Sequence, residues 1–172
     1  AECYEHQNKI KEAYHHWSKI AEDNPAFRGT RIKLESYEGI LGNESLMTLF
    51  TSSLEALQPT IVEMISGLNY NIISKERLSP NEYRYKAYNI KRINDPPILI
   101  YFHRTTREIT EDAINEFQKH IASEKCKNGI YIATSKFSLR AKTVAQSKTI
   151  ELYDADYVKR TIEKIQSRKK IK

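Results

Sequence analysis

The segment from Asn128 to Gln166 constrains the fold more than any other part of the chain, because it contains two short apolar runs that are each followed by a helix-length stretch. Gly129 to Thr134 is rich in β-branched and aromatic residues, which is typical of a buried strand. Thr149 to Tyr153 predicts a second strand, and Asp154 stands where it can cap a closing helix. Since a helix rather than a tight turn separates the two strands, we expect them to pair in parallel.

Apolar residues at helical spacing predict the two helices of this segment. The first helix has Phe137, Ala141, Val144 and Ala145 on one face, and the second has Tyr157, Val158, Ile162 and Ile165. Three further strands are expected upstream: one beginning at Tyr70, one from Glu82 to Lys91, and one from Ile98 to His103. The last of these, ILIYFH, is the most apolar and is therefore predicted to be the central strand.

Helices are predicted on either side of these strands. Asn43 can cap a helix that carries Leu46, Leu49, Phe50 and Leu57, and Pro59 is tolerated near the start of a following helix that ends at Asn69. Thr110 is a candidate cap for a helix with Ala113, Ile114, Phe117 and Ile121 on one face. The pattern as a whole predicts an α/β fold with a mixed central sheet flanked by helices.

The first part of the chain has a different character. Its clearest feature is a helical stripe of Ile10, Ala13, Tyr14, Trp17 and Ile20, which ends at Asn24-Pro25. We therefore predict two parts: a helical N-terminal extension over residues 1–42 and an α/β domain over residues 43–172. The extension could pack on the domain or dock a protein partner through its helix.

Positive charge is concentrated in the last third of the chain. From Glu124 to Lys172 there are 13 Lys and Arg residues against 5 Asp and Glu residues, whereas the remainder of the chain has 15 against 17. A local basic region is the electrostatic signature of a protein that binds nucleic acid or another anionic surface. A Lys-rich tail such as Gln166 to Lys172 is equally compatible with a purely solubilising role.

Cysteine content and hydropathy bear on whether the chain has disulfides, a metal centre or a membrane span. Cys3 and Cys126 are far apart and lack the spacing of a metal site or a disulfide framework, so we expect no metal centre built on cysteine. No apolar run reaches the roughly 18 residues that a membrane span requires. These observations favour a cytoplasmic location, and they leave open an anchor or domain upstream of Ala1.

Three segments together resemble a known family. They are GIYIATSKFSLRAKTVA, the IELYDADYVKRTI that follows it, and the earlier LQPTIVEMISGLNYNII, in which Asn69 stands where the family has glycine. Over roughly Gln58 to Gln166 the chain resembles the Mrr-like restriction endonucleases of the PD-(D/E)xK nuclease superfamily. The resemblance implies a restriction-endonuclease-like fold and metal-dependent hydrolysis of DNA, in which carboxylates hold Mg²⁺ and a lysine lies near the attacking water.

The resemblance also locates the positions that would carry this chemistry. The acid expected on the first helix falls at Gln58. The acid expected at the start of the second strand falls near Arg84, with Glu82 as the nearest carboxylate. The pair on the third strand, an acid or Gln two residues before Lys, falls on Tyr101 and His103. Because none of these positions keeps the expected metal-binding acid, the resemblance implies a catalytically degenerate relative, with Mg²⁺ as cofactor only if the nuclease is active.

DNA binding could persist without catalysis. Arg104 and Arg107 follow the third strand, and Lys136, Arg140 and Lys142 follow the fourth, so both groups could stand near one edge of the sheet and contact phosphates. We therefore predict a DNA-binding pseudoenzyme. Two alternatives stay open: an active metal-dependent endonuclease that uses Glu55 or Glu82 with His103, and a protein-interaction module in which the fold is only a scaffold.

Overall fold

A computed structural model describes residues 1–7 and 9–170 of the chain. These residues divide into two compact units, Ala1–Ser53 and Leu54–Lys172. The division falls after the predicted boundary at residues 42 and 43. Where the functional domain begins stays a prediction. Ile171 and Lys172, at the end of the predicted basic tail, lie outside the described residues.

The first unit is helical, as predicted. Its helices are α1 (Glu2–His6), α2 (Ile10–Asp23), the short 3-10 helix η1 (Phe27–Gly29), α3 (Thr30–Leu41) and α4 (Glu44–Thr51). The buried carboxylate of Glu5 ties three of them together, because it accepts hydrogen bonds from Trp17 Nε1 at 2.7 Å, Tyr37 Oη at 2.8 Å and Lys33 Nζ at 3.0 Å. Burial alone would raise the pKa of Glu5, but the bonds from Lys33, Tyr37 and Trp17 outweigh this and lower it.

The second unit is an α/β domain built on one sheet. Its elements are α5 (Leu54–Gly67), β1 (Tyr70–Ser79), β2 (Glu82–Asn89), β3 (Ile98–His103), α6 (Glu111–Ser123), β4 (Gly129–Ala133), α7 (Leu139–Ser147), β5 (Ile150–Tyr153) and α8 (Ala155–Lys170). The strand order is β1-β2-β3-β4-β5, so β3 is the central strand, as its hydropathy predicts. Pairing is antiparallel from β1 to β3 and parallel from β3 to β5, which confirms the mixed sheet.

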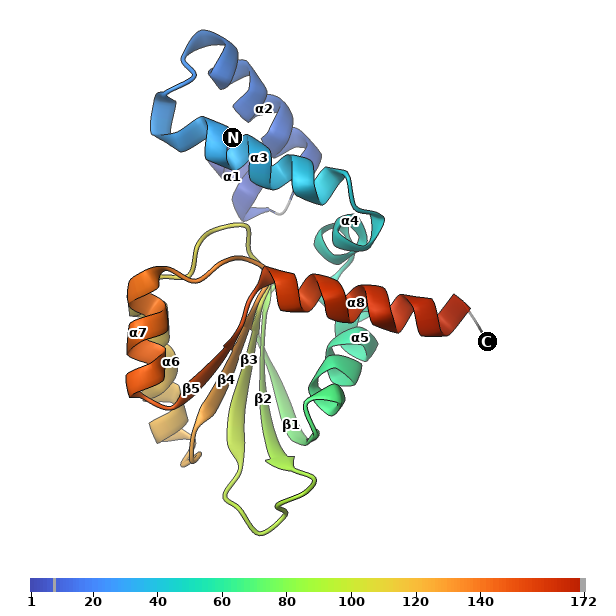
Figure 1. Cartoon of the computed structure of the whole chain (residues 1–172), viewed down its shortest axis with the longest axis vertical. Helices are drawn as coiled ribbons and strands as arrows, with labels where there is room; N and C mark the ends of the chain where they lie inside the picture. Colours follow the sequence, from blue (N-terminus) through green and yellow to red (C-terminus); the bar gives the residue numbers. More distant parts are fainter. Residues whose placement is uncertain (8, 171–172) are drawn as a thin grey trace. The chain divides into compact units, whose positions relative to one another are not determined.

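Helices cover both faces of this sheet. Figure 1 shows α6 and α7 on one face and α5 and α8 on the other. Alternation along each strand sends successive side chains to opposite faces, and residues directly opposite each other in an antiparallel pair share a face. The register pairs Tyr85 with Ile100 and Arg84 with Tyr101, so each pair belongs to a different face. The face that carries Tyr85 and Ile100 is covered by α5 and is called the α5 face. The face that carries Arg84 and Tyr101 is covered by α6 and is called the α6 face.

The α6 face is packed tightly where α6 and α7 lie on it. The buried cluster there comprises Leu99, Ile109, Ile114, Phe117, Ile121, Tyr131, Ala133, Phe137, Ala141, Ala145 and Ile150. Gly129 is part of this packing, because a β-carbon added to it would lie 2.5 Å from Ile121 Cδ1 and 2.7 Å from Phe117 Cε1. The absence of a side chain at Gly129 therefore allows α6 to approach β4 closely.

Several local signals act as the sequence predicts. The side chain of Asn43 accepts a hydrogen bond from Leu46 N at 3.0 Å, and Asp154 accepts from the first turn of α8. Thr110 occupies the cap position of α6 without a side-chain capping bond. Asn69 has a φ of 65°, a left-handed conformation that Asn tolerates better than most residues, and this explains how it replaces glycine between α5 and β1.

Two helix boundaries differ from the prediction. The helix capped by Asn43 ends at Thr51, and Leu57 belongs instead to α5, because Ser52 is extended and interrupts the helix. As a result Pro59 lies inside α5 rather than at its start. Phe137 precedes α7 instead of lying within it, since its backbone pairs with Ile109. None of the described helices combines the length and hydropathy needed to cross a membrane.

Candidate nucleic-acid interface

Two loops are joined at the edge of the sheet where the parallel strands β3 and β4 end. Thr134, which directly follows β4, donates its backbone N–H to the carbonyl of His103 at 3.1 Å. Its hydroxyl accepts from Thr105 N at 2.7 Å and donates to Thr105 O at 2.8 Å. This reciprocal pair connects the start of the loop after β3 to the start of the loop after β4.

The two loops meet again further along. Ile109 donates to the carbonyl of Lys136 at 2.9 Å and accepts from Ser138 N at 2.9 Å. Ser138 then caps α7, since its hydroxyl accepts from Ala141 N at 3.1 Å. Hydrogen bonds therefore hold the backbone of the two loops and of the first turn of α7 in place. The side chains that project from this backbone start from fixed positions.

Four of the five basic residues predicted to contact DNA project from this region. Arg107 and Lys136 are exposed on the two loops, and Arg140 and Lys142 are exposed on α7. The structure therefore brings together the groups that follow β3 and β4. Arg140 makes a marginal contact with Glu111 of α6, at 3.4 Å, while 85% of its side-chain surface remains exposed. Residues 134–148 contain no Asp or Glu, whereas Glu108, Glu111 and Asp112 lie in the loop after β3 and the first turn of α6.

Arg104, the fifth predicted contact, is in a different environment. It is buried, and its guanidinium donates to Asn81 Oδ1 at 2.9 Å and to the carbonyl of Pro80 at 3.3 Å. Its backbone N–H also bonds to the carbonyl of Asn81. Burial lowers the pKa of Arg104 from its ordinary value. Arg104 thus attaches the β1–β2 turn to the end of β3, an interaction that strand pairing creates and that sequence spacing does not reveal.

His103 is held by neighbours on both sides of its ring. Its Nε2 lies 3.4 Å from Glu82 Oε1, and its Nδ1 lies 3.0 Å from the hydroxyl of Tyr131. The register places Glu82 directly opposite His103, which explains the first contact. Burial lowers the pKa of His103, and the Glu82 carboxylate opposes that effect. The imidazole is therefore a polar group between a carboxylate and a phenol, beneath the edge that carries the basic loops.

Tyr101 is packed among aromatic rings. Its ring centroid lies 5.6 Å from that of Phe117 and 5.0 Å from that of Tyr131. Burial and the nearby Glu82 carboxylate raise the pKa of Tyr101, so its hydroxyl stays protonated at neutral pH. A neutral phenol is a poor substitute for the carboxylate or amide that the resemblance expects at this position.

Gln58 lies on the opposite face of the sheet from these residues. Its side-chain amide donates to the hydroxyl of Tyr85 at 2.9 Å and accepts from Lys75 Nζ at 3.1 Å. Both partners belong to the α5 face, whereas Glu82, Tyr101 and His103 belong to the α6 face. The four family-equivalent positions therefore divide between the two faces and do not converge on one site.

The residues present do not fit an Mg²⁺ site. Such a site needs several oxygen ligands in near-octahedral geometry, whereas His103 contacts one carboxylate and a tyrosine hydroxyl. Glu55, the other acid considered, is ion-paired with Arg77. Over residues 1–7 and 9–170, no cluster of three or more His, Cys, Asp or Glu side chains is arranged to hold a metal ion.

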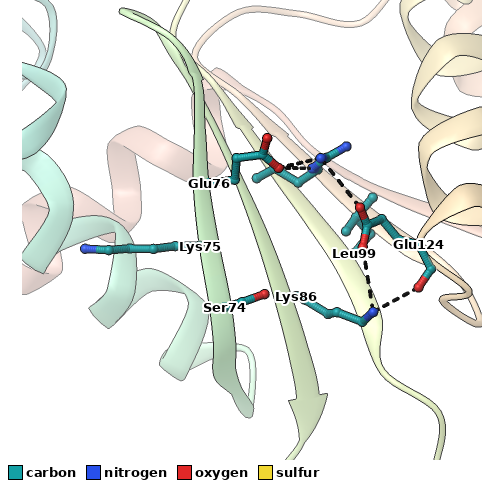
Figure 2. A pocket seen from close by; sticks show the side chains of 7 residues that line it. Ser74, Lys75, Glu76, Lys86, Leu99 and Glu124 are labelled. Carbon is teal, nitrogen blue, oxygen red and sulfur yellow. Dashed lines mark hydrogen bonds and ion pairs between the residues drawn. The ribbon is translucent and has the colours of Figure 1, made fainter.

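A pocket of about 210 Å³ lies on the α6 face, lined by residues of β1, β2 and β3 and by Glu124 (Figure 2). Arg84, the residue aligned with the expected strand acid, is ion-paired with Glu76 and lies 3.6 Å from Glu124. Lys86 donates to the carbonyl of Glu124 at 2.9 Å, and Figure 2 shows Lys75 pointing away from the pocket. Lys86 Nζ also lies 3.7 Å from the Glu124 carboxylate, so Arg84 and Lys86 are both paired with acids and their charges in this pocket are balanced.

The sequence did not predict two features of the segment after β4, one at Leu139 and one at Ser135. Leu139 begins α7 with 81% of its surface exposed, although it is a large apolar residue. The signal was present, because Leu139 is out of register with the apolar stripe of α7. Ser135 is buried, and its hydroxyl has no hydrogen-bond partner within the described part of the chain. No sequence pattern indicates that second feature.

Part of the chain is similar to a known protein family. Residues 84–162 match the family model Mrr_cat, described as a restriction endonuclease. The matched region begins in β2 and ends in α8, so it contains β3 and the two joined loops. The mixed five-stranded sheet with helices on both faces fits a restriction-endonuclease-like fold. No curated protein matches the sequence.

Proposed function

Because residues 84–162 match a restriction endonuclease family model, we propose that this chain is a relative of the Mrr-like restriction endonucleases that binds DNA through its basic loop edge and does not cleave it. The family acts on nucleic acid, and the electrostatics of this edge suit a polyanion. Arg107, Lys136, Arg140 and Lys142 are the proposed phosphate contacts. Arg104 supports the loop from inside instead of touching the DNA, because its guanidinium is buried against the β1–β2 turn.

The single observation that carries the proposal is the contrast between this edge and the strand beneath it. The edge has exposed cations on two loops that are hydrogen-bonded to each other, with no acid in residues 134–148. The strand beneath has Tyr101 and His103, both engaged by other side chains, at the positions where the resemblance expects metal chemistry. Binding requires only the first set of residues, whereas hydrolysis would require the second.

Retention of cleavage is the main competing function, and one contact favours it. Glu82 and His103 lie 3.4 Å apart, so the imidazole has a carboxylate that could orient it as a general base. Against it stands the interaction of the other ring nitrogen with Tyr131, which leaves neither nitrogen directed at a substrate. A nuclease of this kind would need the His103 ring to change partners.

One experiment separates the candidates. Supercoiled plasmid is incubated with the full chain at low ionic strength, with Mg²⁺ or Mn²⁺, and both mobility and topology are read on a gel. The proposal predicts retarded plasmid that stays supercoiled once the protein is removed. Nicked product that disappears in His103→Ala would establish the nuclease instead. Absence of retardation at low salt would leave the protein-interaction module as the remaining function.

A further inference from the structure

Leu139 is the one residue of α7 whose side chain is both large and apolar yet lies almost entirely in solvent, with 81% of its surface exposed. The other apolar residues of this helix behave differently: Ala141 and Ala145 are buried, and Val144 packs against the same cluster. Leu139 therefore contributes little to the core of the domain. A leucine in this position gains its apolar contacts only when something else covers it.

The surroundings of Leu139 identify the chemistry of that partner. Lys136 precedes it in the loop, and Arg140 and Lys142 follow it on the helix, all of them exposed. Thr143 and Gln146 are four and seven residues further on, so they share its side of the helix. A single apolar side chain thus projects from a surface that is otherwise basic or able to form hydrogen bonds.

This combination fits nucleobases better than a protein or a membrane. A stable protein interface needs a broad surface with an apolar core, and an interfacial helix needs a whole apolar face. One leucine supplies neither. Proteins that bind DNA do use single apolar side chains as wedges against bases, while neighbouring basic residues hold the phosphates on either side.

The backbone that carries Leu139 is also held in place by hydrogen bonds. Ser138 caps the helix through Ala141 N, the hydroxyl of Thr143 donates to the carbonyl of Leu139 at 3.1 Å, and the adjacent backbone pairs with Ile109. Such a support lets an apolar contact form without the entropic cost of ordering a loop.

From these observations we propose that Leu139 is a specificity-determining residue that packs against nucleobases, so that the domain prefers DNA with unpaired, unstacked bases to a fully paired duplex. The inference rests on the proposed DNA-binding function and assigns the kind of DNA that the same edge selects. Phosphate contacts alone would not discriminate between the two, because both carry the same backbone charge.

The test measures binding of the full chain to two labelled duplexes of equal length and flanking sequence, one fully paired and one with a short central mismatched bubble. The unaltered protein is expected to bind the bubble more tightly. Leu139→Ala should weaken binding to the bubble by about tenfold, because the complex would no longer bury the apolar surface of one leucine side chain. It should change binding to the paired duplex by less than about twofold, since no base is accessible there. Leu139→Gln, which keeps the length of the side chain and removes its apolar character, should behave in the same way.

Two control variants make the result specific. Ile93→Ala removes another exposed apolar side chain, 69% exposed, in the loop between β2 and β3 at the other end of the sheet, and should leave both affinities unchanged. Arg140→Ala with Lys142→Ala should weaken binding to both duplexes alike. Equal loss on both duplexes in Leu139→Ala, or no loss on either, would overturn the inference while leaving DNA binding intact. If the unaltered protein binds neither duplex at low salt, the proposed function fails and the inference fails with it.

Discussion

At position 103 a histidine replaces the lysine that the resemblance expects, and its ring nitrogens contact Glu82 and the Tyr131 hydroxyl. Position 101 has a tyrosine whose ring packs on Phe117 and Tyr131. Both substitutions convert a position suited to metal chemistry into part of a packed aromatic cluster. The same residues that remove the donors therefore stabilise the sheet against α6.

The environment of His103 predicts a pH dependence of stability. Burial lowers the pKa of this imidazole in the folded protein below its ordinary value of 6.5, so the unfolded chain takes up a proton first as the pH falls. The contribution of the neutral His103 to the free energy of unfolding is therefore fully present above about pH 6.5. It is lost progressively as the pH falls below 6.5 and through the lowered pKa of the folded state. Thermal melts between pH 5 and 8 should show a falling melting temperature over this window. In His103→Gln the fall should be smaller, and an identical fall in both proteins would contradict the assignment.

Gly129 offers a second test at this scale. In Gly129→Ala the new β-carbon would lie within 2.8 Å of side-chain atoms of Ile121 and Phe117, so these two side chains of α6 must move. We expect a loss of about 1–3 kcal/mol in the free energy of unfolding, measured by chemical denaturation. The control is Gly67→Ala at the end of α5, where the added carbon meets nothing within 4 Å. Equal stability of the two variants would show that the close approach of α6 is not required.

Individual residues were the hardest part of the molecule to predict. The resemblance pointed to Gln58 and His103, but it did not indicate that Gln58 bonds to Tyr85 on one face while His103 contacts Glu82 on the other. Those partners depend on the register between strands, which local patterns do not specify. Arg104 illustrates the same point, because its burial depends on the turn of a neighbouring hairpin.

Elements, by contrast, were predicted well from apolar spacing and caps. The five strands and the helices between them occur where alternation and 3.6-residue periodicity indicate, and β3–β4–β5 pair in parallel as the intervening helices require. The errors fall at boundaries. Ser52 breaks a helix that the spacing of Leu57 appeared to continue, and the backbone of Phe137 is taken by Ile109 before α7 begins.

The junction between α5 and β1 gives a prediction at the scale of elements. Asn69 has a φ of 65°, and its carbonyl accepts from Ile90 N at 2.9 Å, so the left-handed turn also links the two ends of the hairpin. Asn69→Gly should leave stability within about 0.5 kcal/mol of the original, because glycine adopts this conformation without strain. Asn69→Val should cost at least about 1 kcal/mol, since a β-branched residue resists it. Similar unfolding free energies for the two variants would contradict the importance of this conformation.

For the molecule as a whole, the sequence predicted the presence of an N-terminal helical region, and it predicted a resemblance to restriction endonucleases that the family-model match over residues 84–162 supports. The sequence could not predict that Glu5 accepts hydrogen bonds from Trp17, Lys33 and Tyr37, because these residues are 12 to 32 positions away along the chain. The distribution of charge was visible from the start. What the structure adds is the hydrogen bonding that holds the loop after β3 against the loop after β4.

The central claim is that this edge binds DNA through its phosphates, and the salt dependence of binding tests it most directly. Anisotropy of a labelled duplex is measured over a range of salt concentrations for the unaltered chain. It is compared with Arg140→Ala/Lys142→Ala and with the matched pair Lys91→Ala/Arg92→Ala, which removes one exposed lysine and one exposed arginine from the other end of the sheet. We predict that affinity falls steeply with salt and that the α7 pair weakens binding and reduces the slope of log affinity against log salt by about 2, while the matched pair changes neither. Equal slopes for the two pairs, or binding that does not respond to salt, would contradict the account.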